Sequence, residues 1–111
     1  MKKVYIHLFA ILPLIGSGQT INQGLLKVEP DTEVSTYFDF KNQTTGDVLN
    51  DGAMHFYGHY HNEGLFSYTT NSRTGYVVFE GLMPDMQKIE GTSPSSFYDV
   101  LFNKSGTQHS F

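Results

Sequence analysis

Short strand-forming runs separated by Asn- and Gly-rich turns are the feature that most restricts how this chain can fold. The turn Asn50-Asp51-Gly52 is followed twelve residues later by the similar turn Asn62-Glu63-Gly64. Asn and Gly tolerate the backbone conformations that tight turns require. Nine Phe and seven Tyr, with many Thr and Ser, give a composition typical of strands and turns. No segment after residue 18 shows the apolar period of an amphipathic helix, so we expect an all-β domain.

Residues 53–61 form the most strand-like run, because their side chains alternate between two faces with the period of two that a half-buried strand requires. Gly58 interrupts the run and predicts a bulge or a tight corner. The face expected in the core carries Met54, Phe56, Gly58 and Tyr60, and the opposite face carries His55, Tyr57, His59 and His61. Further strands are expected at residues 25–28, 33–40, 65–69, 76–80, 88–91 and 97–103.

Two all-β architectures are compatible with these strands. A β-solenoid stacks short parallel strands into successive coils, whereas an antiparallel β-sandwich joins its strands by hairpins. A single spacing of twelve residues between two turns fits either architecture. The solenoid is the expected fold, with the sandwich as the alternative. It predicts that strand 53–61 lies parallel to a later strand.

The first 18 residues resemble a signal peptide. Lys2 and Lys3 precede an apolar run at residues 4–15, and Gly16-Ser17-Gly18 supplies the small residues that a signal peptidase requires. We expect cleavage after Gly18, which divides the chain into a leader helix at 1–18 and a β-rich repeat domain at 19–111. The apolar run is too short to cross the ~30 Å core of a bilayer, so no stable membrane span is expected after cleavage.

Charge and composition exclude several classes of function. The formal net charge is −4 and no cluster of Lys or Arg is present, which argues against a nucleic acid partner. The chain has no Cys, so disulfides and thiolate metal sites are unavailable. No serine lies in a nucleophile elbow, and nothing places two carboxylates across a sugar as a glycosidase requires. We therefore expect neither an enzyme nor a bound cofactor.

A cluster of histidines is the one candidate for a metal site. His59 and His61 lie two residues apart on one face of the expected strand, roughly 7 Å apart along it. Imidazole nitrogen is a common ligand of Zn²⁺ and Cu²⁺. Either His55, if Gly58 kinks the strand, or Glu63 would supply a third ligand. The alternative is that these histidines sit on a solvated strand face.

A series of short motifs runs through most of the chain after the leader. Taken in order, it resembles the N-terminal β-solenoid region of large surface proteins that gliding bacteria export through the type IX secretion system. The motifs in this sequence are Asn50-x-Gly52, Tyr57-Gly58, Asn62-x-Gly64-Leu65, Val77-Val78-Phe79-Glu80-Gly81, Gln87-x-Ile89-Glu90-Gly91, Phe97-Tyr98-Asp99-Val100 and Phe102-Asn103-Lys104-Ser105-Gly106.

The resemblance implies a secreted, non-catalytic segment of the bacterial cell surface, structural or adhesin-like, which passes through the periplasm in transit. Its expected partners are the secretion machinery and cell-surface components or glycans. Members of that family continue for hundreds of residues to a sorting domain, so residues 19–111 are expected to be the N-terminal part of a longer protein. The alternatives are an extracellular metal- or carbohydrate-binding β module and the N-terminal part of an extracellular enzyme.

Overall fold

A computed structural model describes residues 19–71, 73–82 and 86–105, and this part of the chain contains strands but no helix. The strands are short because each one forms a single side of a coil. They are β1 (Gln19–Asn22), β2 (Leu25–Val28), β3 (Glu33–Thr36), β4 (Asp39–Asn42), β5 (Asp47–Asn50), β6 (Ala53–Phe56), β7 (Tyr60–Asn62), β8 (Leu65–Ser67), β9 (Tyr76–Leu82), β10 (Ile89–Gly91) and β11 (Val100–Ser105).

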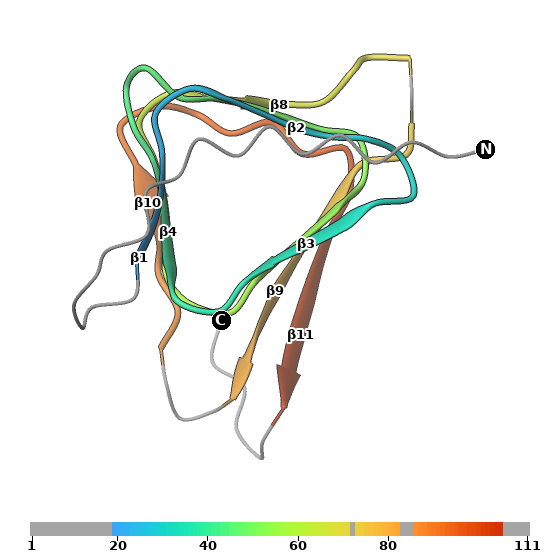
Figure 1. Ribbon diagram of the computed structural model, residues 1–111. Coiled ribbons are helices and arrows are strands. Elements are labelled where there is room, and N and C mark those ends of the chain that lie inside the picture. Colours follow the sequence, from blue (N-terminus) through green and yellow to red (C-terminus); the bar gives the residue numbers. More distant parts are fainter. Residues whose placement is uncertain (1–18, 72, 83–85, 106–111) are drawn as a thin grey trace.

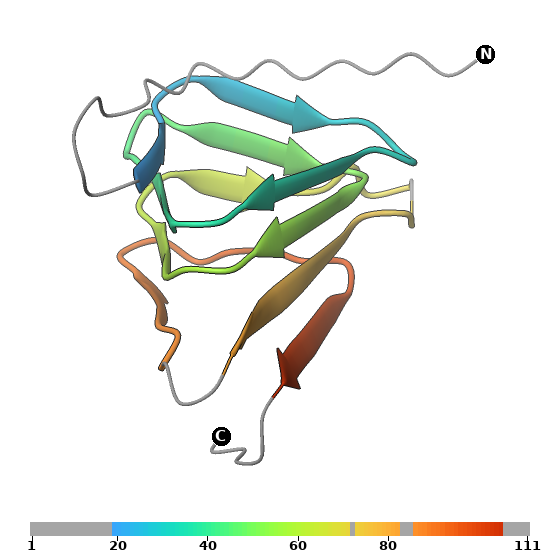
Figure 2. The ribbon, with the colours of Figure 1, turned by 60° about the horizontal axis from the view of Figure 1, so that its bottom comes forward.

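The described strands form three parallel sheets that make the sides of a β-solenoid of about four coils. The strand orders are β1-β4-β7-β10, β2-β5-β8 and β11-β9-β6-β3. Seen along the stack, the coils overlap as a triangle (Figure 1). Turned by 60°, they lie one below another from the N-terminal coil to the C-terminal coil (Figure 2). Every strand pair in this part of the chain is parallel, which confirms the solenoid and excludes the antiparallel sandwich.

The core consists of columns of side chains that point into the triangle, one residue from each coil. Parallel register places each residue of a column directly on its counterpart in the next coil. Nearly all members in the first three coils are buried, whereas Ile89 and Phe102 in the last coil are about half exposed. The columns are Leu26–Val48–Phe66, Val34–Met54–Val77–Val100, Thr36–Phe56–Phe79–Phe102 and Phe40–Tyr60–Ile89.

Aromatic rings stack along two of these columns. The Phe56 and Phe79 rings lie 5.7 Å apart at 28°, and the Phe79 and Phe102 rings lie 5.5 Å apart at 21°. Tyr60 is buried, and its hydroxyl lies 2.6 Å from Ser95 Oγ. Burial raises the pKa of that hydroxyl. Stacked rings bury large apolar areas and favour one registration of each coil on the next.

A ladder of buried asparagines occupies one corner of the triangle. Asn22, Asn42 and Asn62 are in register and fully buried. Asn22 Nδ2 donates to Asn42 Oδ1 at 2.9 Å, and Asn42 Nδ2 donates to Asn62 Oδ1 at 2.9 Å. The Asn42 amide also donates to the carbonyl of Leu65. The ladder therefore provides hydrogen-bond partners for amide and carbonyl groups that are buried at this corner.

The Asn-x-Gly turns have a local cause. Asn62 Oδ1 accepts the backbone N–H of Gly64 at 3.2 Å, and Asn50 Oδ1 accepts that of Gly52 at 3.1 Å, which closes each turn in the manner of an Asx turn. The preceding coil passes close to both glycines. A Cβ at Gly64 would lie 2.3 Å from the carbonyl oxygen of Gln43, and one at Gly52 would lie 2.4 Å from that of Glu29. Only glycine fits there.

The structure corrects two details of the expected strands. The run 53–61 divides into β6 and β7 with a corner at Gly58, and the run 33–40 divides into β3 and β4 with a corner at Tyr37 and Phe38. A single strand at 33–40 would place Phe38 on the same face as Phe40, but at the corner Phe38 is 62% exposed. The tight corner predicted at Gly58 is confirmed. A Cβ there would lie 2.5 Å from the carbonyl oxygen of Phe38.

The twelve-residue spacing between the two turns is not the length of a coil. Asn50 and Asn62 lie at different corners, because Asn50 pairs with Val28 and Asn62 pairs with Asn42. The coil length is twenty residues where it is most regular, as the register of Gln19 with Asp39 and of Phe40 with Tyr60 shows. The third coil is longer, since Tyr60 pairs with Ile89. Its connections from β8 to β9 and from β9 to β10 are the long ones.

The predicted leader, residues 1–18, lies outside the described residues. The first strand, β1, begins at Gln19, directly after the predicted cleavage site. Among the described residues, no helix has the length and apolarity needed to cross a membrane.

We predict that Asn42→Ala destabilises the protein by about 2–3 kcal/mol. The substitution removes two ladder hydrogen bonds, so the buried amides of Asn22 and Asn62 each lose a hydrogen-bond partner. Urea unfolding followed by circular dichroism measures this loss. The control is Gln43→Ala on the same corner, since Gln43 Oε1 accepts from Gln23 in an exposed pair between the same two coils. Its expected cost is below about 0.5 kcal/mol. Equal losses in the two variants would contradict a special role for the ladder.

Candidate functional site

The structure separates the three histidines that the sequence brings together. His55 lies on the outer face of β6, between two carboxylates from neighbouring coils. Its Nδ1 is 2.5 Å from Glu80 Oε2, and its Nε2 is 3.0 Å from Glu33 Oε1. Because both ring nitrogens contact carboxylates, His55 links the β3, β6 and β9 coils on the outside of their sheet. It does not join His59 and His61, which belong to a different side of the triangle.

His61 lies on the outer face of β7 and contacts Glu63, the residue expected as a third metal ligand. The distance from His61 Nε2 to Glu63 Oε2 is 3.0 Å, and His61 Nδ1 is 3.5 Å from Glu90 Oε2. Lys41, the residue paired with His61 in the preceding coil, is 3.9 Å from Glu63. The His61 hydrogen bond, and to a lesser extent the Lys41 charge, hold the pKa of Glu63 below its ordinary value.

His59 lies at the corner before β7, and its Nδ1 accepts the backbone N–H of Lys88 at 2.9 Å. Within residues 19–71, 73–82 and 86–105, no three His, Asp or Glu side chains are arranged to hold a metal ion. Metal binding by His59 and His61 stays a prediction. It requires Zn²⁺ to raise the melting temperature of the wild type and His59→Ala with His61→Ala to remove the rise. His55→Ala is the matched control, and an unchanged wild type would contradict the hypothesis.

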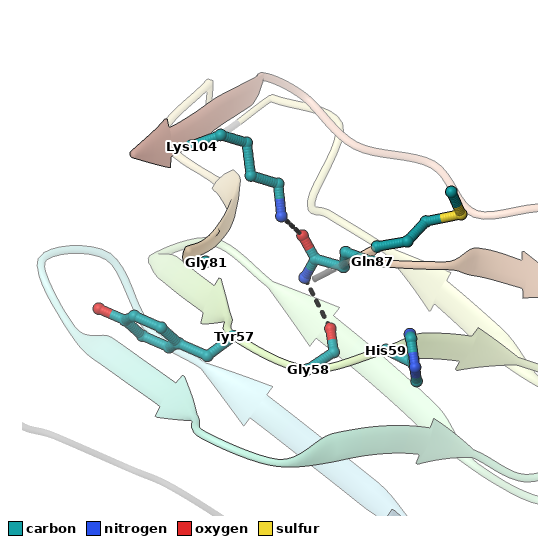
Figure 3. A pocket seen from close by; sticks show the side chains of 7 residues that line it. Tyr57, Gly58, His59, Gly81, Gln87 and Lys104 are labelled. Atoms are coloured by element: carbon teal, nitrogen blue, oxygen red, sulfur yellow. Dashed lines mark hydrogen bonds between the residues drawn. The ribbon is translucent and has the colours of Figure 1, made fainter. Parts of the chain in front are cut away.

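A hollow of about 310 Å³ opens at the same corner, and we call it the corner hollow. Its wall includes Tyr57, His59, Met86, Gln87 and Lys104, which come from three separate segments of the chain. Figure 3 shows Tyr57 and His59 on either side of Gly58, with Gln87 above the glycine. The Lys104 side chain extends toward Gln87. The long corner of the third coil supplies Met86 and Gln87, whereas the shorter corner of the second coil supplies the residues around Gly58.

Gln87 fixes the geometry of the corner hollow. Its Nε2 donates to the carbonyl of Phe56 at 2.9 Å and to that of Gly58 at 2.6 Å, while its Oε1 accepts from Lys104. Lys104 also donates to the carbonyl of Glu80 at 3.1 Å. Partial burial lowers the pKa of Lys104. The ammonium is therefore held in one place by two carbonyl-type oxygens.

Tyr57 joins the corner hollow to a pair of stacked rings. The Tyr37 and Tyr57 rings lie 4.8 Å apart at 24°. Their side chains occupy equivalent positions of successive coils, and both are exposed. Partial desolvation and the nearby Glu80 carboxylate raise the pKa of Tyr57. The corner thus presents aromatic surface directly beside the polar groups of the hollow.

The sequence alone does not identify this site. Tyr57 and His59 were singled out within one strand, but Gln87 and Lys104 carried no pattern that placed them nearby. The twenty-residue interval between Tyr37 and Tyr57 indicates that the two rings lie at equivalent positions of successive coils. It can be interpreted in this way only once the coil length is known. Comparisons of the chain with protein-family models, with curated proteins and with solved structures found no match.

We predict that His61→Ala raises the pKa of Glu63 toward its ordinary value, and that Lys41→Met raises it less, because the His61 hydrogen bond is the larger cause. The Glu63 carboxylate therefore contributes to stability above pH 4.5, and the contribution is lost as the pH falls through the lowered pKa. A carbon-13 NMR titration of the side-chain carboxyl measures these values. The control is Lys27→Met, which breaks a similar pair with Glu29 and should leave the pKa of Glu63 unchanged. If the pKa of Glu63 is the same in His61→Ala as in the wild type, the prediction is wrong.

Proposed function

We propose that this chain is a non-catalytic structural segment of the bacterial cell surface, a β-solenoid that spaces or presents other parts of a surface protein. The observation that carries the proposal is the continuous parallel register of the coils. Two inward columns, the one that ends at Val100 and the one that ends at Phe102, run through all four coils. Such a stack gains its stability from contacts between neighbouring coils, so it forms a stiff element.

The surface location rests on two features of the sequence. Residues 1–18 have the charge, apolar run and small residues of a signal peptide. The order of the turn and strand motifs from Asn50 to Gly106 resembles the solenoid region of proteins exported by the type IX secretion system. The fold gives that resemblance a physical basis, because Phe79 of the Val77-x-Phe79-x-Gly81 motif is an inward ring of the stack. The secretion machinery is the partner that the proposal requires.

Epitope labelling of intact cells tests the location. The epitope is inserted between Thr70 and Asn71, which are exposed in the corner after β8 and therefore tolerate insertion. The gene stays at its own chromosomal position in a bacterium with a type IX system. We expect labelling of intact cells, and loss of this labelling with accumulation in the periplasm when the secretion system is deleted.

A charge reversal supplies the matched control. Lys2→Glu with Lys3→Glu removes the positive end of the leader and should leave the protein in the cytoplasm. Lys27→Glu with Lys88→Glu changes the net charge equally within the solenoid and should preserve labelling. Wild-type protein in the cytoplasm would contradict export, and labelling only after the outer membrane is opened would contradict the surface location. Surface labelling without the secretion system would contradict the type IX route.

A further inference from the structure

The corner hollow combines an aromatic residue with polar and cationic residues, and few classes of ligand match both. Its lining includes one aromatic residue, Tyr57, together with the polar and cationic residues His59, Gln87 and Lys104. A pyranose sugar has matching surfaces, because one face of its ring carries C–H bonds and its rim carries hydroxyl groups. The C–H face packs on an aromatic ring, while the hydroxyls need hydrogen-bond donors and acceptors. The volume of the hollow lies at the lower end of the range for small-molecule sites.

The aromatic part of the corner is rigid and open to solvent. Tyr37 is 67% exposed and Tyr57 is 38% exposed, although each ring covers part of the other. Backing by Tyr37 restricts the rotation of Tyr57, so a ligand that packs on the ring loses little side-chain entropy on binding. Large aromatic groups gathered at one exposed position are typical of a binding surface.

Two donors lie on the polar side of the hollow. An ammonium group has three hydrogens, and the carbonyl of Glu80 and Oε1 of Gln87 use two of those on Lys104. The third can reach a ligand oxygen. His59 Nδ1 accepts from the Lys88 N–H, so its Nε2 carries the hydrogen of the neutral ring and acts as a donor. Gln87 holds Lys104 in position before any ligand arrives, which reduces the cost of binding.

We propose that the corner hollow binds a pyranose ring of a polysaccharide, with the C–H face on Tyr57 and the hydroxyls at Lys104 and His59. The ammonium of Lys104 disfavours a metal cation at the same place. The net charge of −4 disfavours nucleic acid. Neutral sugars and uronic acids share the ring that this site recognises. The proposal stands on the geometry of the corner and does not depend on the proposed export.

Isothermal titration of the whole chain with four oligosaccharides tests the proposal. The probes are cellohexaose, mannohexaose, chitohexaose and oligogalacturonate. We expect at least one to bind, and we expect Tyr57→Ala to weaken that binding about tenfold through the lost ring contact. Tyr57→Phe keeps the ring and should stay within about threefold of the wild type. Lys104→Met should weaken binding about tenfold by removing a charge-assisted donor, and more strongly for oligogalacturonate if the natural ligand is acidic.

Tyr98→Ala is the matched control. Tyr98 is also exposed and also pairs with another tyrosine, Tyr68, but it does not line the corner hollow. It should change binding less than about twofold, and melting temperatures of all variants verify that they are folded. The proposal is overturned if none of the four probes binds the wild type. It is also overturned if Tyr57→Ala binds as tightly as the wild type, or if Tyr98→Ala loses as much affinity as Tyr57→Ala.

Discussion

The buried amide ladder of Asn22, Asn42 and Asn62 is the interaction on which the register of the coils depends. Each side chain bonds to its counterpart twenty residues away and also to the backbone of the turn that follows it. A coil that slipped by one residue would bury these amides without partners and turn the inward rings outward. Polar and apolar contacts therefore favour the same register, and this agreement makes the stack specific as well as stable.

Regular stacking of the sides leaves the corners as the places where coils can differ. The first two coils turn through short connections, whereas the third has long connections from β8 to β9 and from β9 to β10. The second of these carries Met86 and Gln87 out beside Tyr57 and creates the corner hollow. The inward columns nevertheless continue through this coil, because Met54 pairs with Val77 and Phe56 pairs with Phe79. The sheets can therefore stay regular while the connections between strands vary in length and sequence, as loops do on other rigid folds.

Much of the fold could be predicted from local sequence. The parity of Met54, Phe56 and Tyr60 correctly identified core residues, and Gly58 correctly indicated a corner. The coil length could not be predicted, because the conspicuous turns at Asn50 and Asn62 belong to different corners. The twenty-residue repeat is marked by Asn22, Asn42 and Asn62. The pairing of His61 with Glu63 was foreseeable from their spacing. The separation of His55 was not, because a corner at Gly58 sends the chain along another side of the triangle.

The sequence by itself determined the all-β class, the turn chemistry and the alternation of inward and outward side chains, because these depend on residues one to four positions apart. Only the tertiary structure decided which turns share a corner and which surface residues meet. Gln87 and Lys104 approach Tyr57 because parallel stacking brings together residues about 30 and 47 positions away from it along the chain. Contacts between residues so far apart along the chain depend on the length of every intervening coil. That length cannot be predicted from a local sequence pattern.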